Sequence, residues 1–116
     1  MMQTKVCIVG AGCIGLTLAL GLAKAGVDVV VLDSASGEIE IGNEFGLRVS
    51  ALSLASQGLF EKLGVWQDII ATRAQSYQKM DVRDHDSFGK IAFTAADFDT
   101  EHLGHIVEND VIRQAL

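Results

Sequence analysis

Hydrophobic residues near the start of the chain change their spacing twice before residue 34. The β-branched run over 5–9 predicts a short strand, which glycines follow directly. Apolar residues then recur at helical spacing over 14–24 and on more than one face, which predicts a helix buried between layers. Gly26 stands where a helix-ending glycine would, and the apolar run over 28–33 is typical of a parallel strand covered on both faces. This order of elements predicts a βαβ unit with a right-handed crossover.

The pattern becomes less regular after the second strand. Gly, Ser, Glu and Asn dominate 34–46, so an exposed loop is expected there. A helix is predicted to begin at Ser50 and to end at Gly64, with Leu52 and similar residues along one face. A short amphipathic segment over 66–71 follows this helix.

Alternation of apolar and polar residues marks the next part of the chain. Residues 78–84 and 90–94 predict an antiparallel hairpin turned by 85–89, with one face buried and one exposed. Three further elements are expected in chain order: an acidic loop over 95–101, a strand over 104–108 and a helix over 109–116. Because two parallel strands make a poor sheet, residues 1–116 are expected to be the N-terminal portion of a longer domain.

A glycine motif lies in the first turn of the βαβ unit. Gly10, Gly12 and Gly15 form the pattern G-x-G-x-x-G, and Asp33 follows Gly15 by 18 positions at the end of the second strand. Gly10 permits the tight turn, Gly12 lets the backbone approach a pyrophosphate, and Gly15 lets the helix pack closely on the strand. The Asp33 carboxylate suits ribose hydroxyls and disfavours a 2′-phosphate.

The predicted fold class is therefore α/β: a Rossmann-like dinucleotide-binding βαβ unit with an added antiparallel hairpin. The helix N-terminus offers free N–H groups to the phosphates of FAD or NAD, and the residues alone do not separate these two ligands. Seven candidate binding residues follow from the motif: Gly10, Ala11, Gly12, Ile14, Gly15, Asp33 and Ser34.

Composition and charge argue against several other functions. The formal net charge of −6 argues against a DNA or RNA partner, because nucleic-acid binders gather Lys and Arg on one face. A signal peptide or membrane span is the alternative for 6–26, but Gly10 and Gly12 break this run and a second apolar strand follows it. Cys7 and Cys13 fit neither a zinc set nor a disulfide framework, which favours thiols in a reducing cytosol.

Histidines and aspartates around the predicted hairpin do not form a metal pattern. The three histidines fit no zinc spacing. The stretch that begins at Asp84 starts like a calcium loop, but Phe88 and Ala95 occupy its fifth and twelfth positions. No metal is expected. Trp66 lies at helical spacing from Ile69, which favours a core or domain contact over a ligand stack.

Three segments beyond the glycine motif resemble one enzyme family: RVSALSLASQGLFEKLGVWQDI, SFGKIAF and LGHIVENDVIRQAL. With the motif, they resemble the flavin-dependent aromatic hydroxylases of the p-hydroxybenzoate hydroxylase fold, and within that group the 2-polyprenylphenol hydroxylases of ubiquinone biosynthesis. The resemblance implies FAD as cofactor, NAD(P)H as co-substrate and monooxygenation of a polyprenylated phenol by O₂.

The same resemblance implies two further site residues. Arg48 is the arginine of the R-x-x-A-L segment that contacts FAD in the family, and its guanidinium fork suits phosphate or ribose oxygens. Asn109 matches a position where many relatives place Arg or Gln against the nucleotide, with a helix N-cap as the alternative. Two later family motifs are not found in these 116 residues, so no catalytic residue is nominated and the chain alone is expected to be inactive.

The resemblance also implies a cytoplasmic protein that visits the inner membrane surface. Its substrate would be a small-molecule polyprenylphenol. Peripheral membrane contact, contact with a biosynthetic complex, and self-association of the chain through apolar sheet edges remain open. Two other functions remain open as well: an NAD-dependent oxidoreductase built on the same βαβ motif, and a non-catalytic folded remnant.

Overall fold

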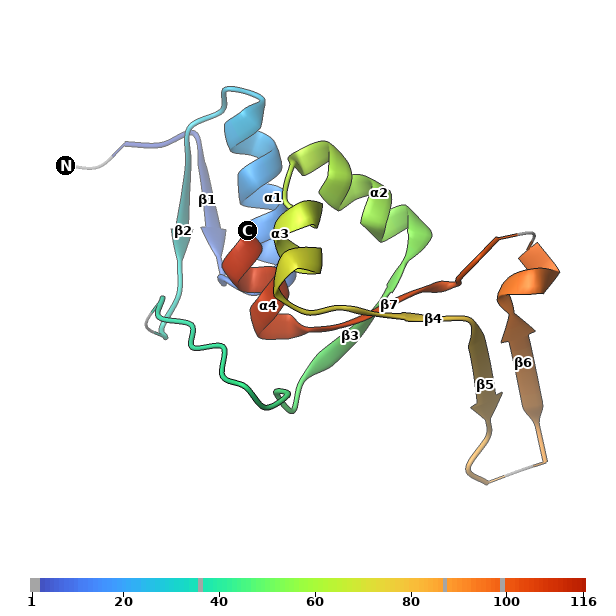
Figure 1. Ribbon diagram of the computed structural model, residues 1–116. Coiled ribbons are helices and arrows are strands. Elements are labelled where there is room, and N and C mark those ends of the chain that lie inside the picture. The colour runs from blue at the N-terminus through green and yellow to red at the C-terminus, as the bar shows by residue number, and fades with distance from the viewer. Residues whose placement is uncertain (1–2, 36, 87, 99) are drawn as a thin grey trace.

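A parallel βαβ unit begins the fold. The computed structural model describes residues 3–35, 37–86, 88–98 and 100–116. Strand β1 (Val6–Val9) pairs in parallel with β2 (Val29–Leu32), and helix α1 (Cys13–Lys24) connects them (Figure 1). Gly26 follows α1 with φ of 82°, the left-handed conformation that glycine adopts without steric cost. The α/β class and the βαβ unit are confirmed.

An antiparallel sheet of three strands forms the second layer. Strand β7 (Gly104–Glu108) lies in its centre, between β3 (Val49–Ser53) and β4 (Gln75–Tyr77). Three helices accompany this sheet: α2 (Leu54–Leu63), α3 (Trp66–Thr72) and α4 (Asn109–Ala115). Because β7 leads directly into α4, the chain passes from the sheet centre to the βαβ unit, where α4 contacts α1 (Figure 1).

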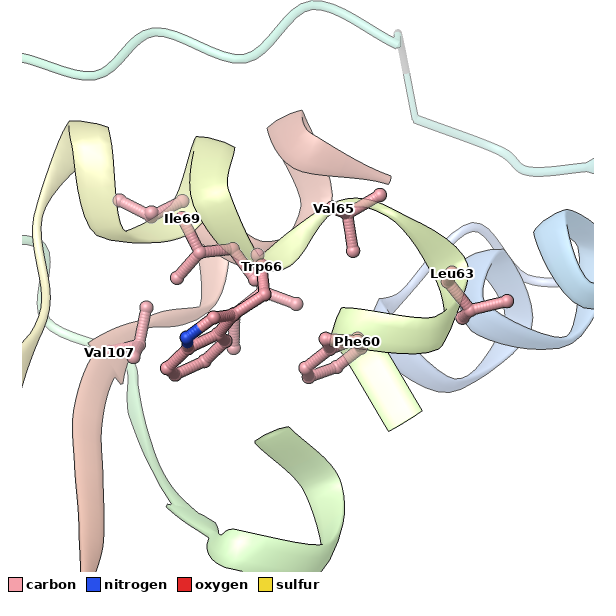
Figure 2. Packing of buried hydrophobic residues seen from close by; sticks show 8 residues of the cluster. Phe60, Leu63, Val65, Trp66, Ile69 and Val107 are labelled. Carbon is pink, nitrogen blue, oxygen red and sulfur yellow. The ribbon is translucent and has the colours of Figure 1, made fainter. Parts of the chain in front are cut away.

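The hydrophobic core lies among these three helices and β7. Figure 2 shows its members packed together, with Trp66 between Phe60 and Val107. The buried cluster comprises Phe60, Leu63, Val65, Trp66, Ile69, Val107, Val111 and Ile112. The predicted core role of Trp66 is confirmed, and its indole also makes an edge-on contact with the ring of His105, at 5.1 Å between centroids.

The predicted helix start at Ser50 is wrong. Residues 49–53 form strand β3, and the helix begins at Leu54, with Ser53 as its N-cap. The side chains of β3 alternate in burial, with Ser50 and Leu52 half-buried between exposed neighbours. Pairing with β7 explains the difference, because Val49 lies opposite Glu108 and the ladder extends along the whole strand.

The sequence prediction also missed β4. This strand has three residues, is mostly polar, and pairs Gln75 with Ile106. Such a short segment carries too few residues for alternation to show. Its extended backbone is set by hydrogen bonds to β7, which is distant in sequence.

The predicted hairpin exists, but the prediction of one buried face is wrong. Strands β5 (Lys79–Arg83) and β6 (Lys90–Thr94) pair antiparallel and project away from the other elements (Figure 1). Ile91 is 57% exposed, and Val82 and Phe93 are also exposed. The prediction failed because the turn over Ala95–Phe98 contacts β6 but leaves most apolar side chains of the hairpin exposed.

Helix α1 is likewise less covered than its apolar pattern predicted. Ala19 is its one buried residue, whereas Leu18 is exposed and Ile14 is 88% exposed. Helix α1 does lie between other elements, since it contacts β1 and β2 as well as α2 and α4, but the expected full burial is wrong, because most of its side chains are only half-buried. Within the described ranges, no helix is long and apolar enough to cross a membrane.

The expected loops and turns are found in outline. A short 3₁₀ turn, η1 (Ala95–Phe98), occupies the first part of the expected acidic loop. The other predicted elements are found close to their predicted bounds. The predictions over 34–46, 85–89 and 95–101 each include one residue outside the described ranges, namely 36, 87 and 99, and the predicted span 1–116 also includes residues 1 and 2.

Candidate dinucleotide-binding site

A pocket of about 510 Å³ opens where the N-terminus of α1 meets the end of β2 and the start of α4. Four segments line it: 11–13 from the glycine turn, 33 and 35 after β2, 46–48 before β3, and 108–110 with 113 from the β7–α4 junction. The pocket therefore lies at the carboxyl end of the parallel strands, where α/β sheets commonly bind ligands.

The three motif glycines have different surroundings. Gly10 has φ of 108° and donates its N–H to the carbonyl of Leu32 at 2.6 Å, which fixes the turn against β2. A Cβ on Gly15 would overlap the carbonyl oxygen of Gly10, so only glycine allows this approach of helix to strand. A Cβ on Gly12 would meet no protein atom within 4 Å. The space beside Gly12 is thus open to a ligand.

The N-terminus of α1 has the features of an anion site. Gly12 is its N-cap, and no side chain caps the helix there. The N–H groups of the first helical turn lack intrahelical acceptors, and the helix dipole places partial positive charge at this end. The open side of Gly12 and these N–H groups together fit the diphosphate of a dinucleotide.

Asp33 lies directly at the glycine turn. Its Oδ2 accepts a hydrogen bond from the N–H of Ala11 at 2.7 Å, and its Oδ1 accepts one from the N–H of Ala35 at 2.8 Å. The N–H of Ala11, followed by that of Ala35, lowers the pKa of the Asp33 carboxyl, so this group is ionised at neutral pH. Each carboxylate oxygen has a second lone pair for a further donor such as a sugar hydroxyl.

The structure brings Arg48 and Asn109 together at the opposite side of the pocket. The N–H of Asn109 donates to the carbonyl of Arg48 at 2.9 Å, and its Oδ1 accepts from the hydroxyl of Ser50 at 2.5 Å. The alternative of Asn109 as helix N-cap is wrong, because Glu108 holds that position and Asn109 is the first residue of α4. Both predicted residues line the pocket.

Four other predicted residues do not line this pocket. Gly10 and Gly15 shape the turn behind it, and Ser34 is an exposed neighbour of Asp33. Ile14 lines a separate apolar groove between α1 and α2. The motif therefore predicted the turn correctly, but only part of it faces the pocket.

A buried ion pair that the sequence analysis missed supports the far wall of the pocket. Glu108 is 7% exposed, and its carboxylate accepts hydrogen bonds from Arg73 Nε at 2.6 Å, from Arg73 Nη2 at 3.0 Å, and from the N–H of Gly46. Arg73 also donates to the carbonyls of Gly42 and Glu44. These bonds hold the segment that leads to Arg48. No local sequence pattern indicates this pair, because its members are 35 residues apart.

Arg113 is another pocket residue that the sequence analysis missed. Its Nε donates to the carbonyl of Ala11 at 3.0 Å, and its Nη1 pairs with Asp110 at 3.3 Å. A signal for it existed, since Arg113 follows Asn109 by four positions and residues at this spacing share one face of a helix.

The two cysteines of the chain are free thiols in different surroundings. Cys7 is exposed, and Cys13 donates its Sγ hydrogen to the carbonyl of Asn109 at 3.7 Å. Burial raises the pKa of the Cys13 thiol, which disfavours the reactive thiolate. Among the described residues, no group of three or more His, Cys, Asp or Glu side chains is placed to hold a metal ion.

Solved structures with the same fold include a monooxygenase and a protein complexed with FAD. The chain superposes on p-nitrophenol 4-monooxygenase PnpA from Pseudomonas putida DLL-E4 with a TM-score of 0.64 and 28% identity, covering 95% of this chain and 26% of that one. The fold also matches Klebsiella pneumoniae R204Q HpxO complexed with FAD, with a TM-score of 0.62 and 24% identity over 98% of this chain and 28% of that one.

Curated relatives include enzymes named for ubiquinone. The 3-demethoxyubiquinol 3-hydroxylase of Escherichia coli (strain K12) is 37% identical over 97% of this chain and 29% of its own length. Ubiquinone hydroxylase UbiL of Rhodospirillum rubrum is 36% identical over 96% of this chain and 25% of its own length. The chain thus spans between a quarter and a third of these relatives, and the resemblance to flavin-dependent hydroxylases is confirmed.

The sequence profile of one protein family covers most of the chain. It is described as FAD binding domain and matches residues 3–108, from just before β1 to the end of β7. FAD, which the residues alone did not separate from NAD, is confirmed as the cofactor. By this match, the chain belongs to the FAD binding domain family.

Proposed function

We propose that the chain is the N-terminal, FAD-binding portion of a monooxygenase that hydroxylates a polyprenylated phenol in ubiquinone biosynthesis, using NAD(P)H and O₂. The observation that carries the proposal is the 37% identity to 3-demethoxyubiquinol 3-hydroxylase over 97% of this chain. That similarity extends beyond the glycine motif, which many unrelated flavoproteins and NAD enzymes share. The chain by itself is expected to bind FAD weakly and to lack activity.

Different residues of the pocket would bind different parts of the cofactor. The N–H groups around Gly12 would bind the diphosphate, and Asp33 would accept hydrogen bonds from the ribose of the adenosine. Arg48 would contact the nucleotide from the opposite wall, where Asn109 and the Glu108–Arg73 pair hold its backbone. When bound, the flavin supplies the redox and oxygen chemistry, and these residues hold it in place and limit its exposure to water.

The proposal is tested with a longer polypeptide that carries this chain together with the regions that its relatives have beyond it. We expect the purified protein to show a flavin absorption band, or to gain one on incubation with FAD. With a short-chain prenylphenol, O₂ uptake and NADPH oxidation should rise together, and mass spectrometry should find one added oxygen atom in the phenol.

Two outcomes would contradict the proposal. A protein that takes up no FAD would refute the cofactor contacts described above. A protein that holds FAD and oxidises NADPH, but releases hydrogen peroxide without changing any prenylphenol, would refute the hydroxylase activity. Assays with phenols that lack the prenyl chain serve as the matched control, because they separate general phenol hydroxylation from recognition of the polyprenyl group.

The nature of this substrate leads to a proposal about location. A polyprenylated phenol partitions into lipid, so the enzyme would work at the surface of the inner membrane while remaining a cytoplasmic protein. Sedimentation of the longer polypeptide with lipid vesicles that contain a prenylphenol tests this contact, and vesicles without the phenol are the control. Recovery of all the protein in the supernatant of both samples would contradict it.

A further inference from the structure

We propose that Arg113 is a cofactor-binding residue whose guanidinium pairs with the diphosphate of FAD. The inference rests on the FAD site proposed above and deepens it, because neither the glycine motif nor the resemblance assigned a role to this residue. Arg113 belongs to α4, which follows β7 and brings its first turn beside the glycine turn.

Two contacts fix the position of the guanidinium. Nε donates to the carbonyl of Ala11, and Nη1 pairs with the carboxylate of Asp110. For Nη2, no hydrogen bond is recorded within the described ranges of the chain. The Arg113 side chain is 25% exposed and lines the pocket, where a ligand can reach it. A guanidinium held by two of its nitrogens keeps the third available at little cost in conformational entropy.

The charges around the pocket favour this role. Three carboxylates line the described pocket, and two arginines, Arg48 and Arg113, are its cations. The three acidic residues are Asp33, Glu108 and Asp110. Glu108 is already neutralised by Arg73, which lies outside the pocket. The charges of the remaining two carboxylates cancel those of the two arginines, so the pocket has no excess positive charge for a dianionic diphosphate. Removing Arg113 would therefore leave the ligand facing a net negative wall.

Asn109 does not supply this charge. Its side chain is neutral, and its Oδ1 is occupied by the hydroxyl of Ser50. Arg113 lies one helical turn further along α4, on the same face as Asn109. Its longer side chain reaches the glycine turn, where Nε contacts the carbonyl of Ala11. The bond to Ala11 also neutralises a carbonyl oxygen whose partial negative charge would otherwise lie beside the phosphates.

The test compares Arg113→Gln, which keeps a hydrogen-bonding side chain without charge, with Arg113→Lys, which keeps the charge without the fork. Binding of FAD and of ADP is titrated at low and high salt with the longer polypeptide. Since a charge-assisted hydrogen bond is lost, we expect Arg113→Gln to weaken both ligands about ten-fold at low salt, with a smaller effect for Arg113→Lys. The difference should shrink at high salt because screening weakens the lost attraction.

Arg83→Gln is the matched control, because Arg83 lies on the hairpin and pairs with Asp81, away from the pocket. It should bind both ligands like the parent protein. Equal FAD affinity in Arg113→Gln and the parent would overturn the inference while leaving the proposed function intact. A loss restricted to FAD, with ADP unaffected, would also overturn it, since ADP carries the same diphosphate. If the parent itself bound no FAD, the proposed function would fail first.

Discussion

At the scale of single residues, Gly12 and Gly15 belong to one motif but lack a side chain for different reasons. The space beside Gly12 is empty of protein, whereas Gly15 lies against the carbonyl of Gly10. The position of each glycine in the motif predicted a separate task for it, and the surroundings of each glycine in the structure give the physical reason for that task. The open space at Gly12 can serve a ligand, and the contact at Gly15 serves packing.

Substitution by alanine should separate these two roles. We expect Gly12→Ala to change the free energy of unfolding by less than about 1 kcal/mol, since its φ of −80° is open to alanine. FAD affinity should nevertheless fall strongly, because the new methyl group fills the space beside the diphosphate. Gly15→Ala should instead destabilise the fold by about 2 kcal/mol or more through overpacking.

Urea unfolding and FAD titration of both variants check this prediction. Gly58→Ala provides the control, because this helical glycine lies outside the pocket and its added Cβ would meet nothing within 4 Å. Unchanged FAD affinity in Gly12→Ala would show that the diphosphate does not lie there.

The Glu108–Arg73 pair leads to a prediction about pH. Arg73, followed by the N–H of Gly46, lowers the pKa of Glu108 below its ordinary value of 4.5. The unfolded chain therefore binds the proton more readily than the folded one. The resulting stability is fully present above about pH 4.5 and is lost as the pH falls through the lower folded pKa.

Unfolding measured from neutral to acid pH tests this dependence. Glu108→Gln should flatten the acid part of the profile, because no proton can then be taken up at this position. Arg73→Gln should destabilise the fold more than Glu108→Gln does at neutral pH, because it leaves a buried carboxylate unpaired. An acid profile that is identical in Glu108→Gln and the parent would contradict the assignment.

At the scale of elements, the boundary between β3 and α2 depends on Ser53. Its hydroxyl accepts a hydrogen bond from the N–H of Ser56 at 3.2 Å, which caps α2. We expect Ser53→Ala to lower the free energy of unfolding by about 1 kcal/mol, since one N–H at the helix start loses its acceptor. Ser53→Asp retains an acceptor and should stay close to the parent. Thermal unfolding compares the two, and equal losses in both would show that the cap contributes nothing.

Elements with a long or strongly periodic pattern could be predicted from sequence. The βαβ unit, β7 and α4 were found because their apolar residues and glycines are regular over each segment. In contrast, Ser50 and Leu52 also fitted the apolar pattern of the helix behind them, and β4 was too short to show alternation. For β3 and β4, the decisive information is the ladder to β7, which joins residues such as Val49 and Glu108 that are far apart in the chain.

At the scale of the whole molecule, the chain is extended. Its radius of gyration is 17.0 Å and its extents are 58 × 31 × 29 Å, whereas a compact chain of this length would have a radius of roughly 13 Å. The β5–β6 hairpin accounts for much of the length (Figure 1). Apolar residues on it remain exposed, and Phe93 packs only partly against Phe98, at 6.2 Å between ring centroids.

This exposure predicts that the 116-residue chain alone associates with itself. Sedimentation should show a mass that rises with protein concentration, because apolar surface and open strand edges favour contact between copies. Ile91→Lys should reduce this association with little change in the free energy of unfolding, since Ile91 is already largely solvated. Ala92→Lys, on the same exposed strand, controls for the added charge. A clean monomer at every concentration would contradict the prediction.

The sequence by itself determined the local part of this protein: the glycine turn, the flanking strands and helix, and the acidic residue that faces the turn. These features depend on backbone conformation and spacing over short distances, which residue type controls directly. The tertiary structure alone decided that Arg113 reaches Ala11, that Arg73 supports the segment before Arg48, and that the hairpin stays uncovered. Each of these depends on which distant segments meet, and that is set by packing of the whole chain.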